Sequence, residues 1–94
     1  MNILNIIGKV DITNVSEELV TRVAEEECAE LIQAISKESR GKANRDNTHE
    51  EIADVMICIA WLIEKLNLNT YEINKWIDYK TNRSKERIAN NEFK

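Results

Sequence analysis

An all-α helical bundle is the fold class that this sequence predicts, and three observations support it. Proline is absent and glycine occurs only at Gly8 and Gly41. Leu, Ile, Ala, Glu and Lys are frequent, and such residues favour long helices over strands. Apolar residues also recur at helical spacing along most of the chain. We therefore expect an antiparallel bundle of three main helices with a short N-terminal segment.

The first main helix is expected to begin after Ser16 and to stop before Gly41. Ser16 is a favourable N-cap residue, and the acidic Glu17 and Glu18 that follow it suit the positive end of the helix dipole. The apolar positions then repeat with the period of a helix at Leu19, Val20, Val23, Ala24, Leu31, Ala34 and Ile35. Residues 1–15 are expected to form a short helix or arm whose Ile and Leu side chains pack on the bundle.

Two further helices follow a short polar, basic connector at residues 42–47. Thr48 is expected to cap the second helix, with Glu51 completing a capping box, and the apolar period continues to Leu68. Asn69 and Thr70 then restart a third helix that becomes basic toward its end.

The length and helix pattern predict one domain over residues 1–94, because chains divide into several cores only at greater length. Three amphipathic helices in so short a chain leave apolar flanks open, and bundles bury every apolar stripe. We therefore expect a homodimer or homotetramer to complete the bundle.

Charge and hydropathy exclude two kinds of partner. The net charge of −4 argues against binding to a nucleic-acid polymer, whose affinity comes mainly from Lys and Arg. The longest uncharged apolar run, Val55–Ile63, is far shorter than the roughly 20 residues that span a bilayer. No secretory signal is recognisable at the N-terminus, so the expected location is cytoplasmic, without a membrane.

Four carboxylates occupy positions where helices usually place apolar side chains. Glu27 and Glu30 are three residues apart, so both project from one side of the first helix, and Glu27 falls on its apolar stripe. Glu51 and Asp54 repeat this arrangement on the second helix. Burying unpaired carboxylates is costly, and four of them facing one another need compensating cations or protons.

A divalent metal ion is the simplest compensation for this set. Ligands that are all oxygen, without sulfur or imidazole, indicate a hard ion, which predicts Mg²⁺, with Mn²⁺ as the alternative. The competing interpretation is a solvated acidic helix face, as in most Glu-rich helices. The joint occurrence on the core-facing side of two helices favours the metal site.

The third helix contains the basic complement at Lys80, Arg83 and Arg87, which recur at spacings of three and four. These side chains are expected to bind phosphate oxygens, and the alternative is a basic surface. Trp61 and Trp76 are expected in the core rather than against a nucleobase.

The remaining candidates for chemistry receive structural interpretations. Cys28 and Cys58 are expected to be reduced core thiols, because two cysteines without close pairing form neither a zinc site nor a redox motif. His49 is expected on the surface.

The segments Glu26-Glu27-Cys-Ala-Glu30 and Glu50-Glu51-Ile-Ala-Asp54 resemble the ExxE and ExxD motifs of MazG-like nucleoside triphosphate pyrophosphohydrolases, over roughly residues 17–88. The resemblance implies that Glu27, Glu30, Glu51 and Asp54 are metal ligands and catalytic residues. It also implies Mg²⁺-dependent hydrolysis of a (deoxy)nucleoside triphosphate to the monophosphate and pyrophosphate. The basic third helix matches less closely, because Ser84 stands where many members have Asn.

Two other functions compete with this hypothesis. A di-iron carboxylate bundle also uses core carboxylates but requires Glu-x-x-His motifs, which the sequence lacks. A non-catalytic helical adaptor or regulator would bind metal or nucleotide in the same acidic cluster without turnover. Pyrophosphate release distinguishes the adaptor from the enzyme.

Overall fold

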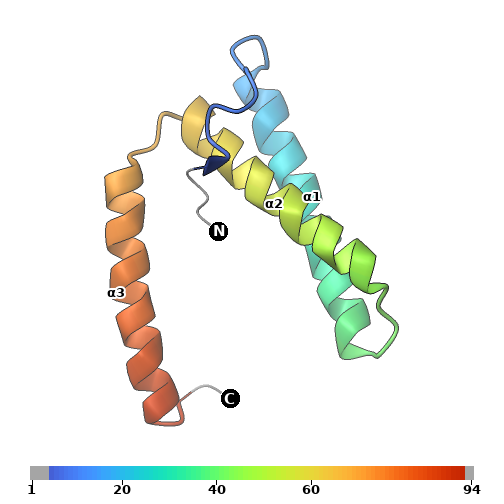
Figure 1. The fold of residues 1–94 in the computed structure, drawn as a ribbon, viewed down its shortest axis with the longest axis vertical. Coiled ribbons are helices and arrows are strands. Elements are labelled where there is room, and N and C mark those ends of the chain that lie inside the picture. Colours follow the sequence, from blue (N-terminus) through green and yellow to red (C-terminus); the bar gives the residue numbers. More distant parts are fainter. Residues whose placement is uncertain (1–4, 93–94) are drawn as a thin grey trace.

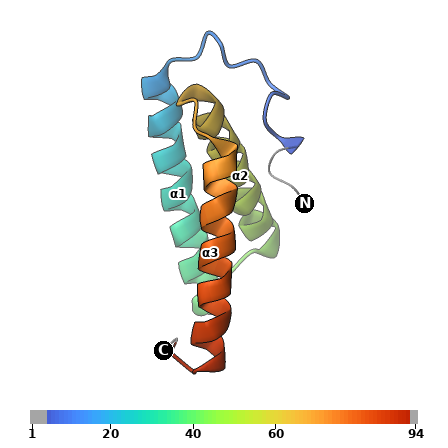
Figure 2. The same cartoon turned by 90° about the vertical axis from the view of Figure 1, so that its left-hand side faces the viewer.

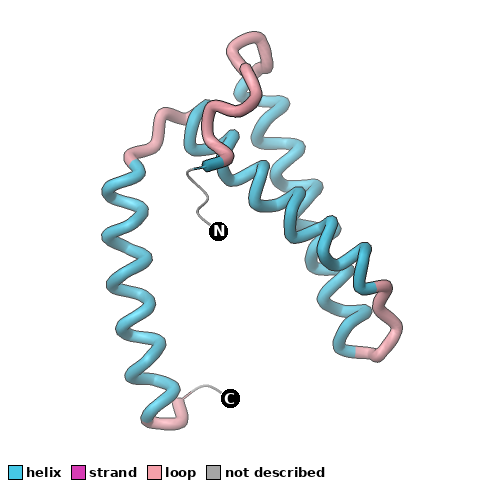
Figure 3. The backbone as a smooth tube through the Cα atoms, in the orientation of Figure 1, coloured by secondary structure: helices cyan, strands magenta, loops and turns pink. Residues whose placement is uncertain are grey.

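The computed structural model describes residues 5–92 and contains three α-helices and no strand within that range. Helix α1 spans Glu17–Ser39, α2 spans Arg45–Lys65 and α3 spans Thr70–Ala89. The all-α class is therefore confirmed (Figures 1 and 3). None of the described helices combines the length and apolar character needed to cross a membrane.

Helices α1 and α2 pack together and form the core, with α2 returning beside α1 after a short connection (Figure 1). The side chains buried between them are mostly small, which lets the two backbones approach closely. The buried apolar residues are Ile12, Val20, Ala24, Ala34, Cys58, Ala60 and Ile63. Glu51 is the buried charged residue of the described chain, with a relative exposure of 7%.

Helix α1 begins and ends where the sequence predicts. The Ser16 hydroxyl oxygen accepts a hydrogen bond from the Leu19 N–H at 3.0 Å. At the other end the Lys42 N–H donates to the Lys37 carbonyl at 2.9 Å, and Gly41 adopts a φ of +68°. This left-handed turn is a Schellman ending, in which glycine avoids the steric cost that a β-carbon would incur.

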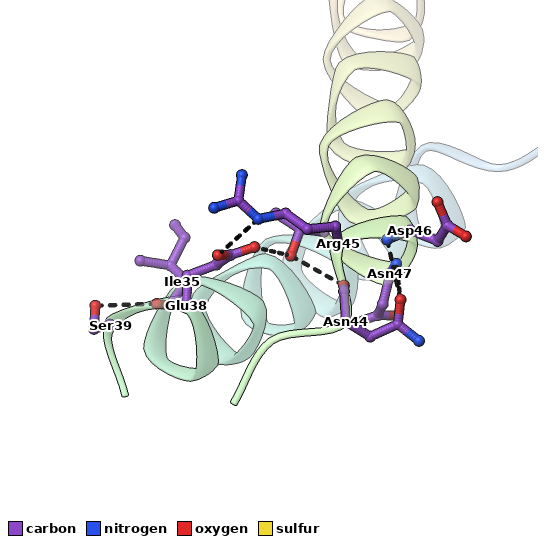
Figure 4. Close-up of polar contacts among 8 residues, drawn as sticks. Ile35, Glu38, Ser39, Asn44, Arg45, Asp46 and Asn47 are labelled. Atoms are coloured by element: carbon purple, nitrogen blue, oxygen red, sulfur yellow. Dashed lines mark hydrogen bonds and ion pairs between the residues drawn. The ribbon is translucent and has the colours of Figure 1, made fainter. Parts of the chain in front are cut away.

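The predicted start of the second helix at Thr48 is wrong. Helix α2 begins at Arg45, and its N-cap is Asn44, whose side-chain oxygen accepts from the N–H groups of Asp46 and Asn47 (Figure 4). Asparagine ranks above threonine as an N-cap. The Thr48 hydroxyl instead donates to the Glu38 carboxylate at 2.8 Å. The helix also ends at Lys65, earlier than the expected Leu68.

Hydrogen bonds hold both ends of the connection from α2 to α3. The Leu68 N–H bonds to the Ile63 carbonyl at 2.9 Å, with Asn67 in the left-handed region at a φ of 52°. Asn69 caps α3 by accepting from the Glu72 N–H at 3.2 Å, as the sequence predicts. Two consecutive caps therefore set the direction in which α3 leaves α2.

Helix α3 lies away from the α1–α2 pair (Figure 1), which it overlaps only in the view turned by 90° (Figure 2). It has no buried residue and packs extensively against neither of the other helices. The expected packing of three helices is therefore realised within one chain only for α1 and α2.

The N-terminal arm, defined here as residues 5–16, crosses the end of α2 in an irregular path. Ile12 is buried at 3% exposure and anchors the arm. The Lys65 ammonium donates to the carbonyls of Ile12 and Thr13, at 3.2 and 3.4 Å. The arm thus packs on the helix pair through Ile12, whereas residues 1–4 lie outside the described range.

Candidate functional site

The helix pair brings together carboxylates that are distant in the sequence. Carboxylate oxygens of Glu27 on α1 and of Glu51 and Asp54 on α2 all lie within 4.8 Å of one another. Glu51 and Asp54 are three residues apart, so they share one side of α2. Glu27 occupies the facing side of α1, three residues after the buried Ala24. Three of the four predicted ligands therefore converge.

Glu30, the fourth predicted ligand, is exposed but borders the same cluster. Its negative charge is the largest cause, after burial, of the raised pKa of Glu51. We define the carboxylate cluster as Glu27, Glu30, Glu51 and Asp54.

Two oxygens of the cluster are buried without a hydrogen-bond partner. They are Oε2 of Glu27 and Oε2 of Glu51. Buried polar atoms are nearly always paired, because an unpaired one loses its hydration without replacement. Both oxygens belong to residues of the converging set, so these two glutamates have acceptor capacity that no described protein group satisfies.

Burial and mutual repulsion raise the pKa values of two members. For Glu51, burial is the first cause and the charge of Glu30 the second. The pKa of Glu27 rises for the same reasons, burial first, followed by the charges of Glu30, Asp54 and Glu51. Desolvation and like charge both disfavour the carboxylate form, so these two glutamates hold protons more tightly than usual unless a cation compensates them.

Cys58 is a neighbour of the cluster that the sequence analysis did not assign to it. Burial raises the pKa of its thiol, and the charges of Glu27 and Asp54 raise it further. Its position one turn after Asp54 on α2 is the sequence signal that places it beside the carboxylates. The thiol therefore stays protonated beside the negative charges of the cluster.

The predicted phosphate-binding residues do not join the cluster in this chain. Lys80 and Arg83 are exposed on α3, and Arg87 is half-buried near the end of that helix. The Lys80 ammonium lies 6.0 Å from the Trp76 ring, and Arg87 pairs with Glu92 at 3.9 Å. The sequence placed Lys80 on a stripe facing the carboxylates, whereas α3 as a whole lies away from α1 and α2.

Several side chains differ from their expected burial. Trp76 is 60% exposed and packs edge-on against Tyr79, so its expected place in a core is wrong for the single chain. Both cysteines are unpaired as expected, but only Cys58 is buried, whereas Cys28 is exposed. Trp61 is half-buried, and His49 is exposed as predicted.

The chain shows no significant match to any protein-family model, curated protein or solved structure.

Proposed function

We propose that the chain is a Mg²⁺-dependent nucleoside triphosphate pyrophosphohydrolase whose centre is the carboxylate cluster. The observation that supports this most directly is the pair of buried, unpartnered oxygens on Glu27 and Glu51. Carboxylate oxygens of Glu27, Glu51 and Asp54 lie within 4.8 Å of one another, and bound protons or a cation would offset the repulsion between them. The resemblance of the two motifs to MazG-like enzymes supplies the reaction.

The residues fit a hard divalent cation. Glu27, Glu51 and Asp54 would hold it directly, with Glu30 at the exposed edge. An all-carboxylate donor set suits Mg²⁺, which also keeps waters and substrate phosphate oxygens, and it suits Mn²⁺ as a substitute. When bound, the ion neutralises polyphosphate charge and lowers the pKa of a coordinated water.

Glutamate side chains of the cluster would supply the remaining catalytic roles. Glu30 is exposed and close to Glu51, so it is placed to accept a proton from the attacking water, with Glu27 as the alternative base. Glu27 and Glu51 hold the buried side of the site, where water is excluded. Hydrolysis would yield a nucleoside monophosphate and pyrophosphate.

The substrate's phosphate chain requires cations beyond the metal, and α3 contains them. Lys80, Arg83 and Arg87 would bind phosphate oxygens by charge-assisted hydrogen bonds. Because the caps at Asn67 and Asn69 hold α3 away from its own helix pair, we propose that a homodimer or homotetramer brings α3 to the cluster of a neighbouring copy. The exposed apolar side chains of α3 would be covered in the same assembly.

The decisive experiment is pyrophosphate release from a panel of ribo- and deoxyribonucleoside triphosphates, with MgCl₂ or with a chelator. We expect release with at least one triphosphate in Mg²⁺ only. A Glu51→Gln chain should be inactive, and a Glu25→Gln chain, altered on the exposed side of α1, should behave as the unmodified protein.

The second candidate is a non-catalytic adaptor that binds metal or nucleotide in the same cluster. It is favoured if calorimetry detects Mg²⁺ or nucleotide binding that Glu51→Gln abolishes, while no triphosphate is hydrolysed. Absence of both binding and hydrolysis would contradict either function.

A further inference from the structure

A polar hollow lies at the turn between α1 and α2. The charged residues that line it are positive, whereas those of the carboxylate cluster are negative. The volume of the hollow is about 410 Å³. The residues that line it, here called the basic turn, are Lys37, Arg40, Lys42, Asn44 and Asn47. Three are cations, two are amides and none is acidic, in a chain whose net charge is −4.

Hydrogen bonds of the backbone fix the shape of the basic turn. The Lys42 N–H bonds to the Lys37 carbonyl at 2.9 Å, and the Gly41 N–H bonds to the Glu38 carbonyl at 3.1 Å. These bonds bring the backbones of Lys37 and Lys42 together across the ending of α1. Both lysines therefore line the same hollow because the helix ending brings their backbones together.

The cations of the basic turn are not neutralised from within the protein. Neither Lys37 nor Lys42 forms an ion pair among residues 5–92. The nearby carboxylate of Glu38 is occupied elsewhere, by the Arg45 guanidinium at 3.2 Å and by the Thr48 hydroxyl (Figure 4). Arg40 uses only its Nε, which donates to the Ser36 carbonyl at 3.3 Å. Its terminal guanidinium nitrogens thus have no partner at this turn.

The donors in this hollow match the oxygens of a phosphate group. Lysine and arginine side chains only donate hydrogen bonds, and arginine presents two parallel donors to an oxyanion. The Asn44 side-chain oxygen is already engaged in capping α2, which leaves its NH₂ group as a donor. The backbone N–H groups of Asp46 and Asn47 bond to Asn44, so a ligand would be held by side chains.

We propose that the basic turn binds a phosphate-bearing anion, as a site separate from the carboxylate cluster and independent of metal. Asn47 precedes Glu51 by one turn of α2, a rise of about 6 Å, so the two sites are adjacent but opposite in charge. Inorganic phosphate, pyrophosphate and the phosphate chain of a nucleotide share the chemistry that this hollow recognises.

The test uses the whole chain in chelator at low ionic strength, without metal or turnover. Sodium phosphate, sodium pyrophosphate and a nucleoside triphosphate are titrated separately into isotopically labelled protein, against sodium chloride at equal ionic strength. Amide resonances are followed by NMR. We expect saturable shifts at the basic turn, and the order of affinities measured there identifies the preferred source of the phosphate.

The matched variants are Lys37→Ala with Lys42→Ala, and Lys75→Ala with Lys85→Ala on α3, which change the net charge equally. The first pair should weaken binding by about tenfold or more, because two charge-assisted hydrogen bonds are lost, and the second pair should not. Glu51→Gln should leave binding intact. Absent or non-saturating shifts at the basic turn, or equal weakening of binding there by both pairs, would overturn the proposal, whereas additional shifts on α3 would report the separate contact proposed for Lys80, Arg83 and Arg87. Failure of triphosphate hydrolysis would leave this binding result unaffected.

Discussion

Glu51 combines burial, negative charge and an unpartnered oxygen. Its substitution therefore tests the proposed metal site while the fold is kept. Replacing it with glutamine keeps its size and removes the charge that Glu30 and Asp54 repel. We expect Glu51→Gln to reduce Mg²⁺-dependent turnover by more than about 100-fold, since even residues behind a metal ligand are worth about 10- to 100-fold. Helicity by circular dichroism should be unchanged, and stability without metal should rise.

Glu27→Gln, Glu30→Gln and Asp54→Asn are expected to act in the same direction, with Glu25→Gln as the control. Full activity in any two of the four cluster variants would contradict the assignment of the site.

The raised pKa values of Glu27 and Glu51 also predict how stability depends on pH without metal. Both exceed their ordinary value of 4.5 in the fold, so the folded state binds protons more tightly than the unfolded state. Their contribution to stability is fully present below pH 4.5 and is lost as the pH rises through the folded pKa. Hydrogen bonds from Thr13 lower the pKa of Asp11, so its contribution to stability is lost as the pH falls. That loss occurs below its ordinary pKa of 3.8.

We therefore expect the free energy of unfolding in chelator to fall as the pH rises above 4.5, and to fall less steeply in Glu51→Gln. Urea unfolding at a series of pH values measures both slopes. Equal slopes would show that Glu51 does not hold its proton more tightly in the fold.

At the residue scale, the sequence predicted what depends on helical spacing. Glu27, Glu51 and Asp54 were found because a carboxylate on an apolar stripe is visible in one helix. The Lys65 ammonium, by contrast, donates hydrogen bonds to two carbonyls of the N-terminal arm. That contact spans more than fifty positions, and no local pattern encodes it.

The N-terminal arm is the element whose attachment depends most on one side chain. The Ile12 carbonyl accepts from both the Lys65 ammonium and the Val15 N–H. Lys65→Met keeps the apolar stem but removes the donor, and hydrogen bonds to charged groups contribute about 1.5–3 kcal/mol. Because this ammonium is only partly buried, we expect a loss of about 1 kcal/mol.

Hydrogen exchange at Val15 reports the loss directly. The Val15 amide should exchange faster in Lys65→Met than in the unmodified protein. Amides in the middle of α1 should exchange at the same slow rate in both proteins. Lys85→Met, which makes the same substitution at an exposed position of α3, is the control. Unchanged exchange at Val15 would mean that burial of Ile12 alone holds the arm.

At the element scale, the N-cap of a helix was predictable where one capping residue preceded the helix. It was unpredictable where two capping residues preceded the helix. Ser16 and Asn69 cap their helices as expected. Asn44 and Thr48 both precede the apolar period of α2, and the capping-box pattern favoured Thr48. In the structure Asn44 is the cap and the Thr48 hydroxyl donates to Glu38 of α1, a tertiary contact that no local pattern encodes.

At the scale of the whole molecule, α3 is the part that the single chain leaves uncovered. Trp76, Ile77 and Ile88 are 60%, 52% and 68% exposed, and the connection to α2 is fixed by caps at both ends. Helix–helix pairing between α1 and α2 followed from sequence because each has a long apolar stripe. The position of α3 did not, because its direction is set by two caps and not by its own stripe.

We expect the protein to be a homo-oligomer at micromolar concentration, and Ile77→Asp to dissociate it. An aspartate in a covered apolar face loses its hydration without a partner, whereas Asn82→Asp makes the same charge change on the other side of α3. Light scattering measures the mass of each. A monomeric mass for the unmodified, active protein would refute the assembly.

The last prediction concerns whether α3 reaches the substrate. Lys80, Arg83 and Arg87 share one side of the helix, whereas Lys85 faces away from them. Lys80→Met keeps the apolar stem beside Trp76 but removes the ammonium. If a neighbouring copy's α3 binds the phosphate chain, kcat/KM should fall by about tenfold, because one charge-assisted hydrogen bond is lost.

The affinity for Mg²⁺ without nucleotide should stay equal or improve in Lys80→Met, because an ammonium near the cluster opposes a cation. Lys85→Met should leave both quantities unchanged. If Lys80→Met and Lys85→Met are equally active across substrate concentrations, α3 does not hold the triphosphate. The metal ion and the basic turn would then remain as the phosphate-binding groups, and the NMR titration of the basic turn would measure how strongly that turn binds.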